Sequence, residues 1–231
     1  MTGNPTQDLG PCVAVFDLDG TLTWRDTLMP YLLGYALRHP SRWVRLWRVP
    51  AALVAYVAAG RDRGVLKSRV IGAVLGGESR SAIEQWTAHF VGNLQDRHRF
   101  RPAALATLAA HRAAGDHLVL LSASPDLYVP QIGRLLGFER TLCTELAWDY
   151  AASGDARLRG ALITPNRRGE EKSRCLDWLR RQYRDLPVVA YGNSGADLPH
   201  LVMADRALLV NGSSAARRAA AIAGVPLADW S

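Results

Sequence analysis

Short apolar runs and longer amphipathic stretches alternate along most of the chain. Apolar runs without regular polar alternation lie at residues 12–17, 117–122, 187–192 and 206–211. Strands with this composition are typically buried on both faces, as in a parallel sheet between two layers of helices. The segment 141–150 and a short apolar run at 161–164 predict a small hairpin beside that sheet. The pattern therefore predicts an α/β fold.

The stretch between the first two strands has a helical pattern instead. Apolar residues recur at helical spacing over 26–39, 41–59, 63–75 and 79–91, and glycine or proline separates these segments. We therefore predict a helical cap over residues 24–100, inserted directly after the first strand. Residues 1–23 and 101–231 are predicted to form the core that carries the sheet.

The first strand ends in two aspartates, Asp17 and Asp19. Residues i and i+2 of a strand point the same way, so both carboxylates project to one side just before Gly20 lets the chain turn. Two crowded negative charges favour a divalent cation or a shared proton. The alternative is an ordinary acidic turn formed by Asp19, Gly20 and Thr21.

Other polar residues follow the later strands. Because parallel strands carry ligands outside their carboxyl ends, we expect these residues to converge. The Ser122 hydroxyl and the backbone N–H groups after it could hold a phosphate oxygen, before a helix predicted to begin near Asp126; Ser124 is the better helix cap. Asn193 and Asp197 offer oxygen ligands suited to Mg²⁺.

Lys172 is singled out by composition. It is one of only two lysines in the chain, while arginine carries nearly all the other positive charge. An ammonium and a planar guanidinium fit different sites, so a lysine in an arginine-rich chain indicates a need for a compact charge. The alternative is a solvated charge cluster at the start of an amphipathic helix.

Charge and cysteine content exclude some classes of protein. The formal net charge is +7, but the arginines are spread along the whole length, so no nucleic-acid partner is expected. The three cysteines are far apart and suggest neither a disulfide framework nor a zinc site, which fits a cytoplasmic protein. The first ten residues show no secretory signal pattern.

One segment of the cap, residues 42–59, has some membrane character. Its apolar part is about half of the roughly 20 residues that a membrane span requires, and Pro50 interrupts it. Interleaved arginine and tryptophan could instead rest on an anionic bilayer surface as a peripheral contact. A helix packed in the cap with its arginines pointing outward is the commoner explanation, and it is the one favoured here.

Taken together, D-L-D-G-T (17–21), Ser122, Lys172 and G-N-S-G-A-D (192–197) resemble the ordered motifs of the haloacid dehalogenase-like phosphohydrolase superfamily. The insertion after the first motif is similar to subfamily IB, which contains the phosphoserine phosphatases. This resemblance implies a Rossmann-like parallel-sheet core and a helical-bundle cap. It also implies that Asp17 is a nucleophile forming an aspartyl-phosphate and that Asp19 is the general acid and base.

The resemblance further implies ligand-binding roles. Mg²⁺ would be held by Asp17, the backbone carbonyl of Asp19, Asn193 and Asp197. Lys172 and Ser122 would face the phosphoryl oxygens, and Gly20, Thr21 and Ala123 would join them in binding phosphate. Phosphoserine phosphatases carry an aspartate where this chain has Asn193, which removes one negative charge and should weaken metal affinity.

The resemblance leaves the substrate open. Asp26 and Arg69 match the positions that recognise the amine and carboxylate of phosphoserine, although Asp26 could equally cap the first cap helix. The first hypothesis is a small phosphorylated, phosphoserine-like metabolite. The cap also resembles that of a neighbouring branch that includes phosphatidylglycerophosphate phosphatases, so a lipid headgroup is an alternative. A non-catalytic binding protein with the same fold is the third.

Overall fold

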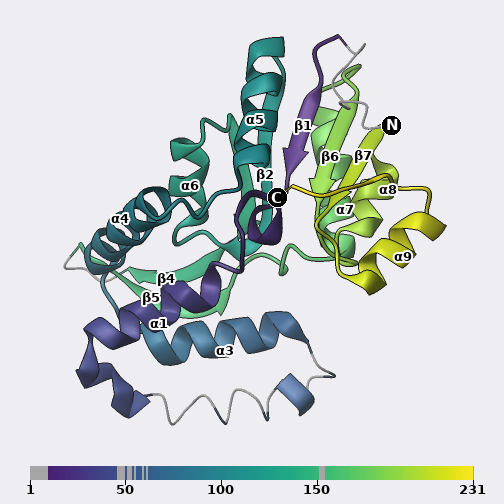
Figure 1. The fold of residues 1–231 in the computed structure, drawn as a ribbon. Coiled ribbons are helices and arrows are strands. Elements are labelled where there is room, and N and C mark those ends of the chain that lie inside the picture. Colours follow the sequence, from purple (N-terminus) through teal and green to yellow (C-terminus); the bar gives the residue numbers. More distant parts are fainter. Residues whose placement is uncertain are drawn as a thin grey trace.

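The structure, a computed structural model, describes residues 10–45, 50, 54, 56–58, 60, 62–150 and 154–230. Its centre is a six-stranded sheet, and Figure 1 shows helices on both sides of it. The strands lie in the order β3 (Arg140–Thr144), β2 (His117–Pro125), β1 (Val13–Phe16), β6 (Val188–Gly192), β7 (Arg206–Val210) and β8 (Leu227–Ala228). Every neighbouring pair is parallel. The predicted α/β core is confirmed.

The side chains of the central strand β1 alternate between two apolar layers. Ala14 and Phe16 pack in the layer that includes α5 (Pro102–Ala114) and α6 (Val129–Leu135). Val13 and Val15 pack in the layer that includes α7 (Glu170–Gln182), α8 (Leu198–Met203) and α9 (Ser214–Ile222). All four side chains are fully buried. Burial on both faces explains why this run lacks polar alternation.

The parallel register places the carboxyl ends of the strands along one edge of the sheet. Phe16 of β1 pairs with Leu120 of β2 on one side and with Tyr191 of β6 on the other. Asp17 follows at once, and its N–H donates to the Tyr191 carbonyl at 3.0 Å. The chain then makes the short π-helical turn η1 (Leu18–Leu22), where Gly20 has a φ of 86° that favours glycine.

The cap follows η1, and its described elements are helical apart from an isolated bridge between Ser79 and Arg157. It comprises α1 (Leu28–Arg38), the 3-10 turn η2 (Pro40–Arg45), α3 (Arg63–Leu75) and α4 (Arg80–Asp96). The two segments that join cap and core pair antiparallel at Thr23 and Phe100. Tyr31 and Trp86 of the cap belong to the same apolar cluster as Phe16 of the core. The predicted helical insertion after the first strand is therefore confirmed.

The segment 42–59 is predicted to pack as a cap helix, with contact at a bilayer surface as the alternative, and half of its residues lie outside the described part of the chain. Within the part of the chain that the structure describes, no helix is both long and apolar enough to cross a membrane. A crossing helix needs about 20 predominantly apolar residues.

Two local predictions need correction. The predicted small hairpin forms, as β4 (Leu146–Tyr150) pairs antiparallel with β5 (Ala156–Leu162), but the start of the segment 141–150 belongs to β3 and joins the main sheet. The stretch after Ser122 is strand rather than turn, and the next helix begins at Val129 instead of near Asp126. Pairing with β3 explains this extension, since Pro125 lies opposite Thr144 and the Asp126 N–H donates to the Thr144 carbonyl.

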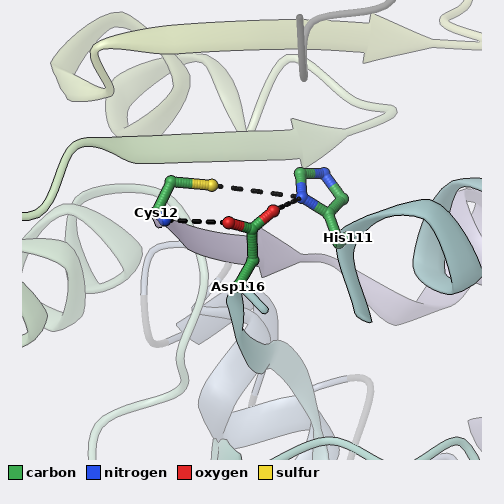
Figure 2. Close-up of side chains that lie close together, drawn as sticks. All are labelled: Cys12, His111 and Asp116. Carbon is green, nitrogen blue, oxygen red and sulfur yellow. Dashed lines mark hydrogen bonds and ion pairs between the residues drawn. The ribbon is translucent and has the colours of Figure 1, made fainter. Parts of the chain in front are cut away.

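A buried polar network lies at the amino ends of β1 and β2 (Figure 2). His111 Nδ1 lies 2.6 Å from Asp116 Oδ2 and 4.0 Å from Cys12 Sγ, and the Cys12 N–H donates to Asp116 Oδ1. His111 Nε2 lies 2.8 Å from the Tyr191 hydroxyl. The three ligand-type side chains are close enough to hold a metal ion, yet both nitrogens of His111 already have protein partners. The network ties α5 to β1 and β6.

Candidate active site

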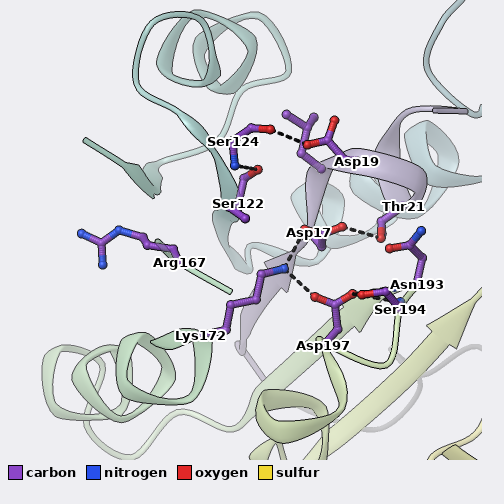
Figure 3. A network of polar contacts seen from close by, with 12 residues as sticks. Asp17, Asp19, Thr21, Ser122, Ser124, Arg167, Lys172, Asn193, Ser194 and Asp197 are labelled. Atoms are coloured by element: carbon purple, nitrogen blue, oxygen red, sulfur yellow. Dashed lines mark hydrogen bonds and ion pairs between the residues drawn. The ribbon is translucent and has the colours of Figure 1, made fainter. Parts of the chain in front are cut away.

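Polar side chains from several segments meet at the carboxyl edge of the sheet (Figure 3). They come from the end of β1, the end of β2, the first turn of α7 and the loop after β6. The residues that meet are Asp17, Asp19, Ser122, Ser124, Lys172, Asn193 and Asp197. Because parallel strands end at the same edge, side chains far apart in the sequence become neighbours.

Lys172 is buried between two carboxylates. Its Nζ donates to Asp17 Oδ1 and to Asp197 Oδ1, each at 2.6 Å. The side chain is only 2% exposed. Burial lowers the pKa of Lys172, but the two carboxylates outweigh burial and hold this pKa above its ordinary value. Lys172 is therefore a fixed positive charge in the centre of the site.

The pKa values of the two carboxyl groups beside Lys172 shift in opposite directions. Burial raises the pKa of Asp17 to about 7; Lys172 opposes this rise, and the Asp197 carboxylate adds to it. Burial also acts to raise the pKa of Asp197, but Lys172 outweighs burial and the pKa falls below its usual range. One ammonium thus faces two acids, and the cluster favours a further cation.

Asp19 lies in a different environment from Asp17. Its Oδ1 accepts hydrogen bonds from the Thr27 N–H at 2.7 Å and the Thr27 hydroxyl at 2.6 Å, and its Oδ2 accepts one from the Ser124 hydroxyl at 2.5 Å. Burial, helped by the charge of Asp26, raises the pKa of Asp19, while these donors oppose the rise. The two acids thus have different partners: Asp17 is paired with the Lys172 ammonium, whereas Asp19 is held by hydroxyl and N–H donors.

The loop after β6 is organised by Asp197. Its Oδ2 accepts hydrogen bonds from the Asn193 N–H, the Ser194 N–H and the Ser194 hydroxyl. The Asn193 amide packs directly on Gly20, where a Cβ would overlap it. Only glycine at position 20 lets the loop after β6 approach the turn after β1 this closely.

The site opens into a cavity of about 440 Å³ between core and cap. Both lysines of the chain line it. Lys67 reaches from α3 of the cap to the core, where its Nζ donates to the Ala123 carbonyl and to Asn166 Oδ1. Burial lowers the pKa of Lys67 to about 8, and the carboxylates of Asp19 and Asp26 partly oppose this. The cap thus contributes a cation that faces the acids of the core.

The residues predicted to bind phosphate occupy different positions. Gly20 and Ala123 line the cavity. Thr21 is buried, and its hydroxyl donates to Asp17 Oδ2 at 3.0 Å. Ser122 is also fully buried and is not among the residues lining the cavity; its hydroxyl accepts a hydrogen bond from the Ser124 N–H. Ser124 does not cap a helix as predicted but faces Asp19.

The two residues predicted to recognise the substrate lie at different cavities. Asp26 lines the cavity, and its Oδ1 also accepts a hydrogen bond from the Met29 N–H in the first turn of α1, so both of its predicted roles are compatible with its position. Arg69 does not line this cavity. It borders a neighbouring hollow, because it lies two positions beyond Lys67 on α3 and therefore points to another side of the helix.

Several residues of the site escaped the motif-based interpretation. Lys67, Arg63 and Arg168 all line the cavity, together with Asn166. The rarity of lysine, which drew attention to Lys172, applies equally to Lys67 and would have identified it. The arginines carried no such signal, because arginine is common throughout the chain.

Comparison with known proteins agrees with this geometry. The sequence profile of the haloacid dehalogenase-like hydrolases matches residues 14–201, a range that begins within β1 and includes Lys172 and Asp197. The chain belongs to the haloacid dehalogenase-like hydrolase family. The family predicted from the motifs is therefore confirmed.

This haloacid dehalogenase-like hydrolase is similar to Protein CicA of Caulobacter vibrioides, with 34% identity over 208 residues that cover 89% of this chain and 87% of CicA. Its fold is similar to a Bordetella pertussis protein of unknown function (TM-score 0.76, 23% identity, 96% of this chain and 100% of that one). It is also similar to a probable phosphoserine phosphatase from Vibrio cholerae (TM-score 0.67, 17% identity, 97% of this chain and 64% of that one).

Proposed function

We propose that this protein is a Mg²⁺-dependent phosphomonoester hydrolase acting on a small phosphorylated, phosphoserine-like metabolite. The observation that carries the proposal is the buried Asp17–Lys172–Asp197 cluster at the base of a cavity, with Asp19 held nearby by hydroxyl donors. An ionised nucleophile and a separate proton carrier are the two groups that ester hydrolysis through a covalent intermediate requires.

The reaction proceeds in two steps. In the first, a carboxylate oxygen of Asp17 attacks phosphorus, the bond from phosphorus to the ester oxygen breaks, and Asp19 gives its proton to the departing alcohol. In the second, Asp19 takes a proton from water, whose oxygen attacks phosphorus and releases Asp17 and inorganic phosphate. The Lys172 ammonium lies beside Asp17, where it stabilises charge on the transferring group.

The donors beside Asp17 fit Mg²⁺, a hard cation that binds one or two carboxylates and otherwise keeps water and phosphate oxygens. Asp17, the backbone carbonyl of Asp19 and the Asn193 amide oxygen would hold it. Asp197 belongs to the predicted ligand set, but its carboxylate already accepts hydrogen bonds from Lys172, Asn193 and Ser194. Bound Mg²⁺ would neutralise negative charge on Asp17 and on the phosphoryl group.

The Asn193→Asp variant is expected to need several-fold less Mg²⁺ for half-maximal activity, since it adds a negative charge beside Asp17. A Mg²⁺ titration of turnover measures this. Asn166→Asp is the matched control, because it adds the same charge in the same cavity next to Lys67. An equal response of both variants would show that Asn193 is not a ligand.

The Ser124→Ala variant is expected to remain active at higher pH than the wild type. The Ser124 hydroxyl donates to Asp19 Oδ2 and so favours the ionised carboxylate, which lowers the pKa of Asp19. Losing this donor raises that pKa. A general acid must be protonated, so the alkaline limb of the kcat profile moves upward. Ser68→Ala, which removes a hydroxyl bound to the Gly160 carbonyl, should leave the profile in place.

A screen of phosphomonoesters with and without Mg²⁺ tests the proposal as a whole. It should include phosphoserine, sugar phosphates, histidinol phosphate and phosphatidylglycerophosphate. Turnover that depends on Mg²⁺ for at least one ester is the expected result. A folded protein that is inert toward every ester would instead support the non-catalytic binding protein.

A lipid phosphate ester is the second candidate substrate, and one surface of the cap favours it. Met29, Leu33 and Leu37 recur every four residues along α1 and are 49%, 56% and 68% exposed. Such a stripe would suit contact with a bilayer. Flotation with vesicles containing anionic lipid tests this candidate; a protein that stays in the soluble fraction at moderate salt counts against it.

A further inference from the structure

A second cavity, of about 590 Å³, lies where the chain crosses between core and cap. We call it the hinge cavity; Trp24–Thr27, Arg38, Trp86, Phe90, Arg97 and Arg99 border it. The two crossings are joined there by backbone hydrogen bonds, from the Trp24 N–H to the Arg99 carbonyl and from the Arg101 N–H to the Leu22 carbonyl. A ligand in this cavity would contact both crossings.

The hinge cavity combines an aromatic interior with a cationic rim. Trp86 and Phe90 are each 7% exposed, and the Trp86 indole N–H is buried without a hydrogen-bond partner among the described residues. The guanidinium groups of Arg97 and Arg99 form no hydrogen bond or ion pair with any residue that the structure describes. Both arginines are exposed, so their guanidinium groups are accessible to an anion that enters the cavity.

We propose that the hinge cavity binds a small organic anion that carries a flat or apolar portion. The apolar portion would lie against Trp86 and Phe90, and the anionic group would be bound by Arg97 and Arg99. Guanidinium groups suit carboxylates, sulfonates and phosphates, because they donate two parallel hydrogen bonds. The volume lies within the range usual for small-molecule sites.

Thr27 links the hinge cavity to the reaction. It lines this cavity, and its N–H and hydroxyl both donate to Asp19. Trp24, Arg25 and Asp26 line both the hinge cavity and the active-site cavity. The bound anion is therefore either the leaving group of an extended substrate or a separate molecule that alters the hydrogen bonds from Thr27 to Asp19. This link rests on the proposed function, whereas binding itself does not.

The test ligand is naphthalene-2-sulfonate. Its binding is measured by the change in tryptophan fluorescence, because Trp24 and Trp86 border the cavity. We expect saturable binding that weakens about tenfold or more in the Arg97→Gln/Arg99→Gln variant, since two charge-assisted hydrogen bonds are lost. The Arg181→Gln/Arg184→Gln variant makes the same charge change at exposed positions that do not line the cavity, and it should bind normally. Equal weakening in both variants, or equally tight binding of uncharged 2-naphthol, would overturn the proposal.

Kinetics with p-nitrophenyl phosphate then separate the two sources of the anion. A change in kcat without competition identifies a separate ligand. If the anion instead competes with the ester, it occupies the position of the leaving group. In that case the Arg97→Gln/Arg99→Gln variant should have a raised KM only for esters that carry a second anionic group. The absence of both effects overturns the link through Thr27. An enzyme inert toward all esters would contradict the proposed function and leave the fluorescence result standing.

Discussion

The Asp17→Asn variant is expected to lose on the order of a thousandfold or more in kcat, because an amide is not a nucleophile toward phosphorus. The fold should persist, since the change is nearly isosteric and removes a buried carboxylate whose pKa is already raised. Steady-state kinetics at saturating Mg²⁺ on the best ester from the screen measure the loss. Thermal unfolding checks that the variant is folded.

A matched control separates this effect from a general loss of charge. Asp149→Asn makes the same chemical change on the exposed hairpin, where Asp149 pairs with Arg159. It should keep the wild-type kcat. General acid–base assistance alone contributes more than about tenfold to a rate. If Asp17→Asn retains turnover within about tenfold of the wild type, Asp17 is not the nucleophile.

The Lys172→Met variant is expected to lose both activity and stability. Removing the ammonium leaves the carboxylates of Asp17 and Asp197 buried without a counter-charge. Breaking a buried ion pair from one side typically costs about 3–5 kcal/mol in the free energy of unfolding. Urea unfolding at neutral pH in the absence of metal ions measures this loss.

Two further variants test that explanation. Adding Asp17→Asn to Lys172→Met should recover part of the stability, because one of the two unpaired acids is then removed. Lys67→Met should cost less, since Lys67 donates to an uncharged carbonyl and an amide. If the two single lysine variants lose equal stability and the double variant recovers none, the charge-pairing explanation of Lys172 is wrong.

Much of the core could be predicted from local pattern. The fully apolar run of β1 requires burial on both faces, and Asp17 and Asp19 had to follow it at the edge of the sheet. Parallel strands end at one edge, which explains why Lys172 and Asp197 meet Asp17 despite their distance along the chain. The hairpin was predicted correctly, but residues 141–144 join the main sheet instead, because an apolar run does not reveal which strand will pair with it.

The cap contribution could not be predicted in the same way. Lys67 and Arg69 are two residues apart on one helix, and only the packing of α3 against the core decides which of them enters the cavity. Ser122 and Ser124 are likewise similar in sequence and both are buried, yet only Ser124 lines the cavity and donates to Asp19, while the Ser122 hydroxyl accepts from the Ser124 N–H. In both cases the decision depends on contacts between segments distant in the sequence.

The sequence by itself determined the family, the parallel core with its helical insertion and the acidic pair at the end of the first strand. These follow from periodicity and from the order of motifs, which are local properties of the chain. Only the tertiary structure decided that both lysines share one cavity, that Asp19 is held by Thr27 and Ser124, and that Arg97 and Arg99 border the cavity at the hinge. The reason is physical: local pattern specifies which side chains are buried, whereas the packing of cap on core specifies which of them meet.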